Sequence, residues 1–413
     1  MSMLKKMLVA VAVIAMAIPA FAAVESIKVG GDITTYGIGR YNFDWSDGHD
    51  HFLQTSTRVY VNAALTDNVE AMVRLINERM WDRNFNGEDT NSINLDLAYI
   101  KVSDLGIAGL DLTVGRQEIQ FGEGLVVGSA YVPGYSYPNG NTWIVAEDLG
   151  LQRAFDAIRV DYKGTAPVDV TAFMAKIIEK VDTNRDRNLY GVNVGFDIQD
   201  TARLEGYYVR YQLMSTDNFS LGTIGLRATG DVAGLGLKGE FAKQLGKWYP
   251  GGRDNEGWAL LLGGEYNFDA AVSGNIHANL NLFSGYDGSG DNTEWITRFP
   301  YNTGSRIGPI NYVLITDWAI EMLNNARVIN VGAAVNPVEK ICINFDWWNV
   351  NLMEEAWAGD DKTIGNEIAA GITYNYTEDL CFGLQYGVLL TGDALGMFDN
   401  DPWQLIASMK VAF

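Results

Sequence analysis

The feature of this sequence that most limits its fold is an alternation of apolar and polar side chains with a period of two. The alternation is clear at residues 58–65, 70–76, 276–283 and 341–346. It is typical of β-strands whose two faces meet different surroundings. Helical periodicity is confined to a turn or two around residues 317–324. The pattern therefore predicts an all-β protein.

Turn-forming residues separate the strands in a regular order. Short connections are expected at 66–68, 104–109, 164–167, 200–201, 230–234, 269–271, 336–337 and 377–379. Between and around them lie longer polar segments near 43–51, 80–91, 120–150, 180–188, 214–219, 246–256, 285–325, 352–362 and 391–401. These connections separate about eighteen strands, with sixteen as the alternative. Short turns on one rim and long loops on the other indicate an antiparallel barrel of the bacterial outer membrane.

A soluble β-sandwich would show the same alternation. Long strands, unlike connections at the two ends and aromatic residues near strand ends, such as Tyr207, Trp347 and Trp403, favour the barrel. Lipid cannot satisfy a free strand edge, so the first strand, near 27–40, must pair with the last. A barrel of 16 to 18 strands is too wide for its own side chains to fill, which predicts an aqueous lumen.

The two ends of the chain fit export to this membrane. Lys5 and Lys6 precede an apolar stretch at 7–18 and a small-residue cleavage site ending at Ala22, which predicts a signal peptide over residues 1–22. A retained anchor is the alternative, but the stretch is shorter than the roughly 20 residues of a membrane helix. Residues 23–413 are then one barrel domain. Its last strand ends in Phe413, which resembles the signal read by the barrel-insertion machinery.

The charge of the chain limits its partners. Thirty basic residues face 51 acidic ones, a formal net charge of −21, which argues against nucleic acid as a partner. Outer-membrane lipid and lipopolysaccharide are the expected surroundings. Acidic residues of the long loops either keep these loops soluble or bind divalent cations in the lipopolysaccharide layer.

Alternation also assigns charged side chains to the lumen. The candidates for the lumen or its constriction are Arg58, Arg74, Glu78, Arg116, Glu118, Arg153, Arg159, Asp161, Arg210 and Arg227. The same parity assigns Glu70, Asp96, Asp197, Lys238, Glu240, His277, Asp346, Glu367 and Lys410 to this face. These groups either hydrate the interior and pair across strands, or a subset forms a charged constriction that sets ion preference. Only the segments 120–150 and 285–325 are long enough to narrow the lumen.

One strand carries a change of phase. Leu112 and Val114 have one parity and Ile119 and Phe121 the other, so we expect a β-bulge near Gly115 or Gln117. Such a bulge would turn Arg116, Glu118 and Gln120 into the lumen. There they could fasten the 120–150 loop to the wall together with Arg153 and Arg159. The alternative is an ordinary cross-strand pair of Arg116 and Glu118.

The same stretch has a family resemblance. Residues 115–122 (GRQEIQFG), 125–128 (LVVG) and 153–159 (RAFDAIR) resemble the core motif of the alginate-export family of outer-membrane porins. The resemblance implies a monomeric eighteen-stranded channel narrowed by inward loops. It also implies that Arg116, Arg153 and Arg159 are the lumenal arginines, beside Glu118, Glu123 and Asp156. Gly124 stands where the family commonly has a basic residue, and this difference, with the acidic charge, argues against export of a polyanion.

No catalytic or cofactor-binding motif was recognised. The chain lacks Gly-x-Ser-x-Gly and His-Glu-x-x-His and has three histidines, so we expect no enzyme activity, metal or cofactor. Cys342 and Cys381 should lie on strands separated by one other, about 10 Å apart, and stay free thiols. Three functions remain open: a passive porin for small hydrophilic solutes or ions, a selective carbohydrate or organic-acid channel of the alginate type, and a barrel that sheathes a partner such as a cytochrome.

Overall fold

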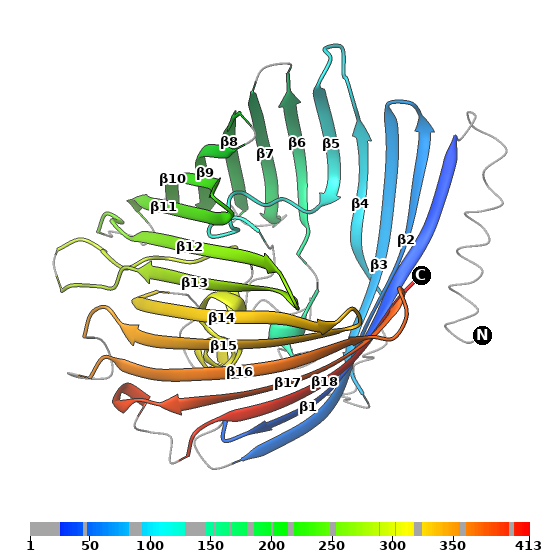
Figure 1. Ribbon diagram of the computed structural model, residues 1–413. Coiled ribbons are helices and arrows are strands. Elements are labelled where there is room, and N and C mark those ends of the chain that lie inside the picture. Colours follow the sequence, from blue (N-terminus) through cyan, green and yellow to red (C-terminus); the bar gives the residue numbers. More distant parts are fainter. Residues whose placement is uncertain are drawn as a thin grey trace.

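The computed structural model describes residues 25–43, 48–81, 93–128, 146–151, 153–164, 167–179, 186–199, 201–213, 219–247, 253–288, 290–301, 303–317, 324–355, 361–395 and 400–413. The expected signal peptide lies outside these residues, as do parts of most of the long loops. The strands are almost completely described, so the wall of the molecule can be followed from end to end (Figure 1).

Eighteen antiparallel strands form the wall. They are β1 (Ser26–Tyr41), β2 (His49–Thr66), β3 (Val69–Met80), β4 (Asn94–Val102), β5 (Leu110–Gln117), β6 (Phe155–Lys163), β7 (Val168–Ile178), β8 (Arg187–Ile198), β9 (Ala202–Leu213), β10 (Phe219–Val232), β11 (Leu235–Lys247), β12 (Trp258–Asp269), β13 (Ser273–Phe283), β14 (Ala326–Val338), β15 (Ile341–Leu352), β16 (Thr363–Asn375), β17 (Leu380–Thr391) and β18 (Trp403–Ala412). Each strand pairs with its neighbours in the chain.

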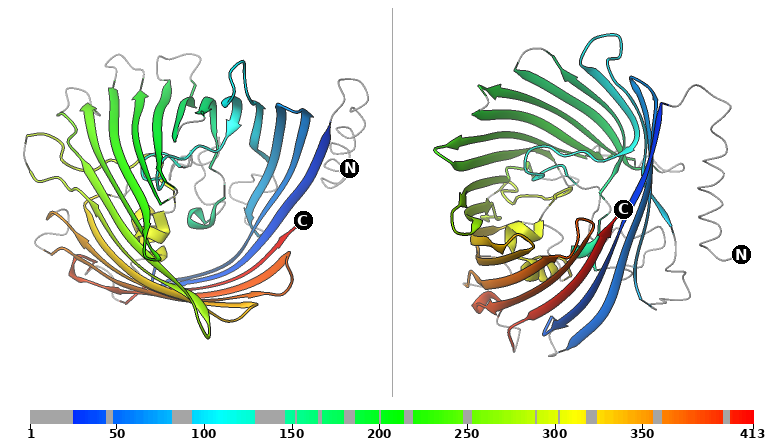
Figure 2. Two further views of the ribbon diagram at one scale, coloured as in Figure 1. Left: turned by 45° about the horizontal axis from the view of Figure 1, so that its top comes forward. Right: turned by 45° about the vertical axis from the view of Figure 1, so that its right-hand side comes forward.

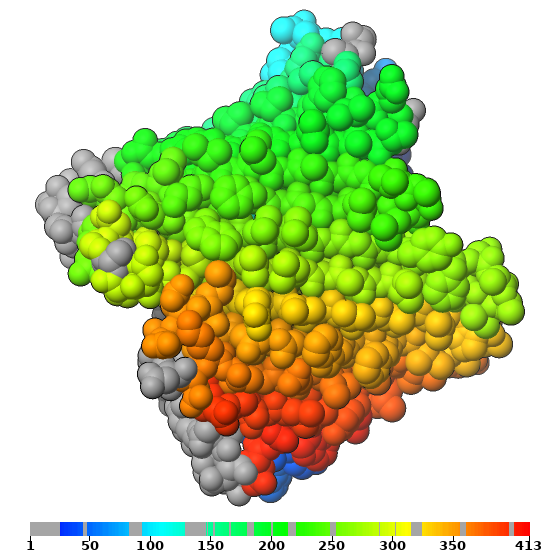
Figure 3. Space-filling view, turned by 60° about the vertical axis from the view of Figure 1, so that its left-hand side comes forward, coloured from blue at the N-terminus to red at the C-terminus, as the bar shows by residue number. Residues whose placement is uncertain are grey.

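The sheet is closed. β1 pairs with β2 on one side and with β18 on the other, where Ile38 lies opposite Ile406. In Figure 1 the blue first strands and the red last strand lie side by side. The space-filling view shows neighbouring strands covering one outer face continuously (Figure 3). The predicted eighteen-stranded closed barrel is confirmed, and every wall strand finds its backbone partners within the sheet.

The connections alternate as the sequence predicts. Successive strands are joined by short turns on one rim, for example the two residues between β2 and β3, and by longer segments on the other. Cys342 on β15 faces Thr373, and Cys381 on β17 faces Asn375, both on β16 between them. The pairing of β16 with both β15 and β17 confirms the strand order deduced for this region, and both cysteines are free.

Exposure follows the alternation. On β9, Tyr207, Val209 and Tyr211 point inward and are buried, whereas Leu204 and Tyr208 on the opposite face are 46% and 45% exposed. The same contrast runs around the wall, where outward Val, Leu, Ile, Phe and Tyr side chains are the exposed ones. An apolar outer face of this kind matches a lipid surrounding.

Three stretches of chain lie inside the barrel. We call them the first (118–128), second (146–151 and 153–154) and third (295–301 and 303–317) inward segments. They contain the short helices η2 (Glu147–Leu149), α2 (Thr303–Ile307) and α3 (Pro309–Asp317); η3 (Asp393–Leu395) follows β17. Figures 1 and 2 show the cyan segment after β5 and the yellow helices within the ring of strands. No helix in the described part of the chain is both long and apolar enough to cross a membrane.

The expected bulge near Gly115 or Gln117 is not present. Pairing of β5 with β4 and β6 is continuous, and the strand ends at Gln117. The phase changes because the chain leaves the wall there, so Ile119 and Phe121 pack inside the barrel as part of the first inward segment. A bulge does occur nearby, on β4. Arg74 and Leu75 of β3 lie opposite Leu97 and Leu95, so Asp96 is an extra residue in the backbone pairing.

Closure of the sheet predicts a specific cross-link. In a background with Cys342→Ser and Cys381→Ser, the pair Gly37→Cys and Ala407→Cys should form a disulfide on mild oxidation, because these residues are directly opposite across β1 and β18. The matched pair Gly37→Cys and Leu384→Cys should not, because β18 separates them. Mobility of the denatured, unreduced chain measures both. Equal cross-linking of the two pairs would contradict the closure.

Candidate channel constriction

The inward segments are held by polar side chains of the wall. Five such side chains accept hydrogen bonds from backbone N–H groups of these segments, and all five are buried. The bonds are Ala146 to Gln54 (2.7 Å), Leu151 to Glu78 (2.8 Å), Glu123 to Glu240 (2.8 Å), Ile296 to Gln244 (2.9 Å), and Ile310 and Asn311 to Glu367 (2.8 and 2.9 Å). An irregular buried segment needs partners for its N–H groups, and the wall supplies them.

The carboxylate of Glu367 shows how closely wall and segment fit. It lies at the start of α3, where the first N–H groups of a helix have no partner of their own, and its two oxygens accept from Ile310 and Asn311. The Asn311 side chain donates to it as well, at 2.9 Å. These bonds satisfy N–H groups at the start of the helix, so Glu367 on β16 positions this helix in the lumen.

The first charged cluster surrounds Glu118. Its carboxylate pairs with Arg74 of β3 at 2.6 Å and with Arg153 at 3.3 Å, and its carbonyl oxygen accepts from Arg159 of β6 at 3.1 Å. Arg74 also pairs with Asp96, and Arg159 pairs with Asp161 at 2.8 Å. Arg153 lies over the ring of Tyr301, 4.5 Å from its centre, which connects this cluster to the third inward segment.

The second charged cluster surrounds Glu123. Its carboxylate pairs with Arg227 of β10 at 2.5 Å and with Lys238 of β11 at 3.2 Å. Burial would raise the pKa of Glu123, but its bonds with Arg227 and Lys238 outweigh burial and lower the pKa below its usual range. Glu205 of β9 pairs with the same Arg227 at 2.5 Å. Arg306 of the third inward segment donates to the carbonyl oxygen of Glu123, so this residue joins two segments to the wall.

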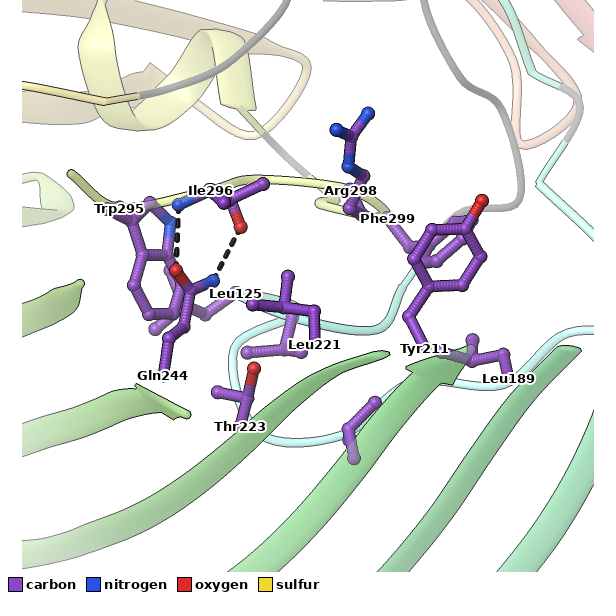
Figure 4. A pocket seen from close by; sticks show the side chains of 12 residues that line it. Leu125, Leu189, Tyr211, Leu221, Thr223, Gln244, Trp295, Ile296, Arg298 and Phe299 are labelled. Atoms are coloured by element: carbon purple, nitrogen blue, oxygen red, sulfur yellow. Dashed lines mark hydrogen bonds between the residues drawn. The ribbon is translucent and has the colours of Figure 1, made fainter. Parts of the chain in front are cut away.

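Apolar packing completes the attachment. Ile119, Phe121 and Val127 of the first inward segment pack with Phe173, Tyr207 and Tyr211 of the wall and with Phe299 of the third segment. Figure 4 shows the pocket between these elements, with Leu125, Leu221 and Phe299 at its sides and the Gln244 amide bonded to both the N–H and the carbonyl of Ile296. At this depth the inner face of the wall is therefore apolar as well as charged.

The glycine that departs from the family motif has a local role. Gly124 has a φ of 72°, in the left-handed region, and a Cβ there would lie 2.9 Å from the Cβ of Tyr301. A basic side chain at this position does not fit the arrangement of the first and third inward segments. Tyr301 in turn donates its backbone N–H to the Gly124 carbonyl.

Most of the predicted lumen residues come together around the inward segments. Arg74, Glu118, Arg153, Arg159 and Asp161 belong to the Glu118 cluster, and Arg227 belongs to the Glu123 cluster. Glu78 holds the second inward segment. Arg58 pairs with Asp32 elsewhere on the wall, at 2.8 Å. That these charges set ion preference stays a prediction.

Two assignments to the lumen are wrong. Arg116 lies outside, because it pairs with Asp156 at 3.2 Å and both alternate with the inward residues Gln117 and Phe155. It therefore does not fasten the first inward segment and does not pair with Glu118. Arg210 alternates with Val209 and Tyr211, which pack inside, so its side chain also points outward. The inward arginine of β9 is Arg203, which pairs with Asp169 and Asp197.

Sequence reasoning missed several groups of this site. Gln54, Gln244, Glu205 and Arg306 were not selected. Glu205 could have been found, because it lies two residues before the inward Tyr207 on the same strand. Arg306 could not, because it lies outside the strands, where alternation predicts nothing. Within the described residues, no three His, Cys, Asp or Glu side chains come close enough together to hold a metal ion.

The barrel and its inward segments define an outer-membrane channel. Solved structures with this fold include Pseudomonas aeruginosa OccK9 (OpdG), 10% identical with a TM-score of 0.62 over 95% of this chain and 100% of that chain. Others are OpdK with vanillate (10%, 0.62, 94% and 99%) and OccK2 (OpdF) in complex with glucuronate (11%, 0.61, 95% and 98%), both from the same organism.

The family model for alginate export matches residues 40–313, well over half of the chain. The protein therefore belongs to the alginate export family, as the motif at 115–159 suggests, and its location is the bacterial outer membrane. The search of curated proteins finds no match.

The Glu123 cluster makes a testable prediction. Glu123→Ala removes the carboxylate shared by Arg227 and Lys238 and leaves two lumenal cations without it. We expect a larger single-channel conductance and a reversal potential shifted toward anion preference in planar bilayers. The matched variant Asp156→Ala breaks an ion pair on the outer face and should leave both values unchanged. Equal effects of the two variants would contradict the assignment of Glu123 to the constriction.

Proposed function

We propose that the protein is a passive channel through which small hydrophilic solutes and ions cross the outer membrane, with its constriction formed by the first and third inward segments. The observation that supports this best is the attachment of both segments to the wall through Glu123, Arg227 and Arg306. Side chains held by several bonds keep a fixed position, and fixed charges along a wet path determine what passes.

The constriction presents both signs of charge. Arg74, Arg153 and Arg159 lie around Glu118, and Arg227 and Lys238 lie around Glu123. Polar groups of this kind can replace part of the hydration of a passing solute without binding it strongly, because each charge already has a partner. The proposed channel is not an enzyme, and it discriminates between solutes by their size and charge.

A second candidate is a channel selective for organic acids. The observation that favours it is the convergence of three guanidinium groups on one residue, Glu118, with Tyr301 stacked on Arg153. A carboxylate solute could compete with Glu118 for these arginines. Two of the similar structures hold vanillate and glucuronate, which are both carboxylates. The inward segments occupy space in which a sheathed partner protein would sit, so we do not propose that function.

Solute flux separates the two candidates. For the passive channel, we expect liposome-swelling rates that fall with solute size, similar rates for glucose and glucuronate, and conductance that rises linearly with salt. For the selective channel, glucuronate would block ion conductance saturably, and Arg153→Gln would relieve the block. Swelling rates equal to those of liposomes without protein for every small solute would contradict both.

A further inference from the structure

Cations gather on the outer face of the wall near the long loops. Strand alternation directs six basic side chains outward, because each is next to a residue that is buried inside the barrel. They are Arg79 on β3, Arg116 on β5, Lys176 on β7, Arg210 on β9, Lys243 on β11 and Arg327 on β14. We call these six residues the basic belt. Asp156 is the one carboxylate that the same alternation directs outward within the described strands.

The basic belt lies near the long-loop rim of the barrel. Each of its residues is within four positions of the end of its strand that leads to a long loop. Two positions further along the strand, toward the short turns, the next outward residue is apolar and exposed in most cases. These residues are Val114, Met174, Tyr208, Phe241 and Ile329. The belt therefore borders the lipid-facing band on its loop side, where the headgroups of the outer leaflet lie.

Part of the belt has no partner among the residues that the structure describes. Arg79, Arg210 and Arg327 make no hydrogen bond or ion pair with any residue that the structure describes. On neighbouring strands, Arg116 and Lys176 lie on either side of Asp156. Lys176 pairs with Glu179 at 2.5 Å and with Asp186 at 3.2 Å, just beyond the strand ends. Lys243 donates to the carbonyl oxygen of Glu256, which leaves its charge without an acidic partner in that contact.

The excess of cations is unexpected for this chain. Acidic residues outnumber basic ones by 51 to 30, and most inward charges are paired across strands. On the outward face of the strands near the long loops, in contrast, six basic side chains accompany one carboxylate, so basic residues outnumber acidic ones there. Guanidinium groups at a lipid interface are suited to phosphate, because their N–H groups match phosphate oxygens in pairs.

We infer that the basic belt binds the phosphate groups of the outer-leaflet glycolipid, the phosphorylated lipid A part of lipopolysaccharide. Phosphates pair with Arg79, Arg210 and Arg327, which have no partner among the described residues, while the acyl chains lie along the apolar residues nearer the short turns. This contact is direct and uses protein cations, so it differs from bridging of acidic loops by divalent cations. It does not depend on which solute passes through the lumen.

Native mass spectrometry of the full barrel in detergent tests the inference. The two probes are bis-phosphorylated lipid A and the same lipid with both phosphates removed. A basic residue near an anionic lipid surface strengthens lipid binding, and several such residues act together in the belt. We therefore expect the parent to bind the phosphorylated lipid at least about tenfold more tightly than the dephosphorylated one. In the triple variant Arg79→Gln, Arg210→Gln, Arg327→Gln, this preference should fall to within about twofold.

Two further variants serve as controls. The triple variant Lys28→Gln, Lys163→Gln, Lys410→Gln changes the net charge equally but at strand ends near the short turns, and it should keep the preference. Replacing Arg79, Arg210 and Arg327 by lysine keeps the charge and should keep most of the preference, which excludes loss of folding as the cause. A parent that does not discriminate between the two lipids, or equal losses in both glutamine variants, would overturn the inference.

Discussion

The structure depends on one constraint: backbone N–H and carbonyl groups must find partners where lipid offers none. Each wall strand meets this constraint through its two neighbours, and pairing of β1 with β18 removes the last free edge. Closure with eighteen strands then creates a lumen that wall side chains alone do not fill. The inward segments between β5 and β6 and between β13 and β14 occupy part of this space.

Inside the lumen the same constraint acts on irregular chain. Glu240 and Glu367 on the wall accept N–H groups of the first and third inward segments, and Arg306 donates to Glu123 to join these segments. Burial of an unpaired N–H group costs about 1–3 kcal/mol, so each of these acceptors stabilises one position of the segment over others. Backbone hydrogen bonds to the wall thus position the inward segments, and the inward segments in turn position the charged side chains of the constriction.

Much of the fold could be predicted from the sequence, because alternation and turn residues are local signals. The lumen side chains were harder to assign. Arg210 was assigned inward because a wet lumen suggests polar side chains, yet the inner face of β9 is apolar where Tyr207 and Tyr211 pack on the inward segments. Arg116 was misplaced because the phase change after Gln117 marks departure from the wall, and this cannot be distinguished from a bulge without the pairing. Contacts such as that of Arg306 depend on tertiary structure alone.

Access of water to the lumen tests the central claim most directly. In a background with Cys342→Ser and Cys381→Ser, cysteine can replace Asn279 or its neighbour Ala278 on β13, which alternate between the inner and outer faces. A charged, membrane-impermeant thiol reagent added to channels in a planar bilayer should modify Asn279→Cys and lower its conductance, and should leave Ala278→Cys unchanged. Reaction at both positions, or at neither, would contradict a barrel that is wet inside and covered by lipid outside.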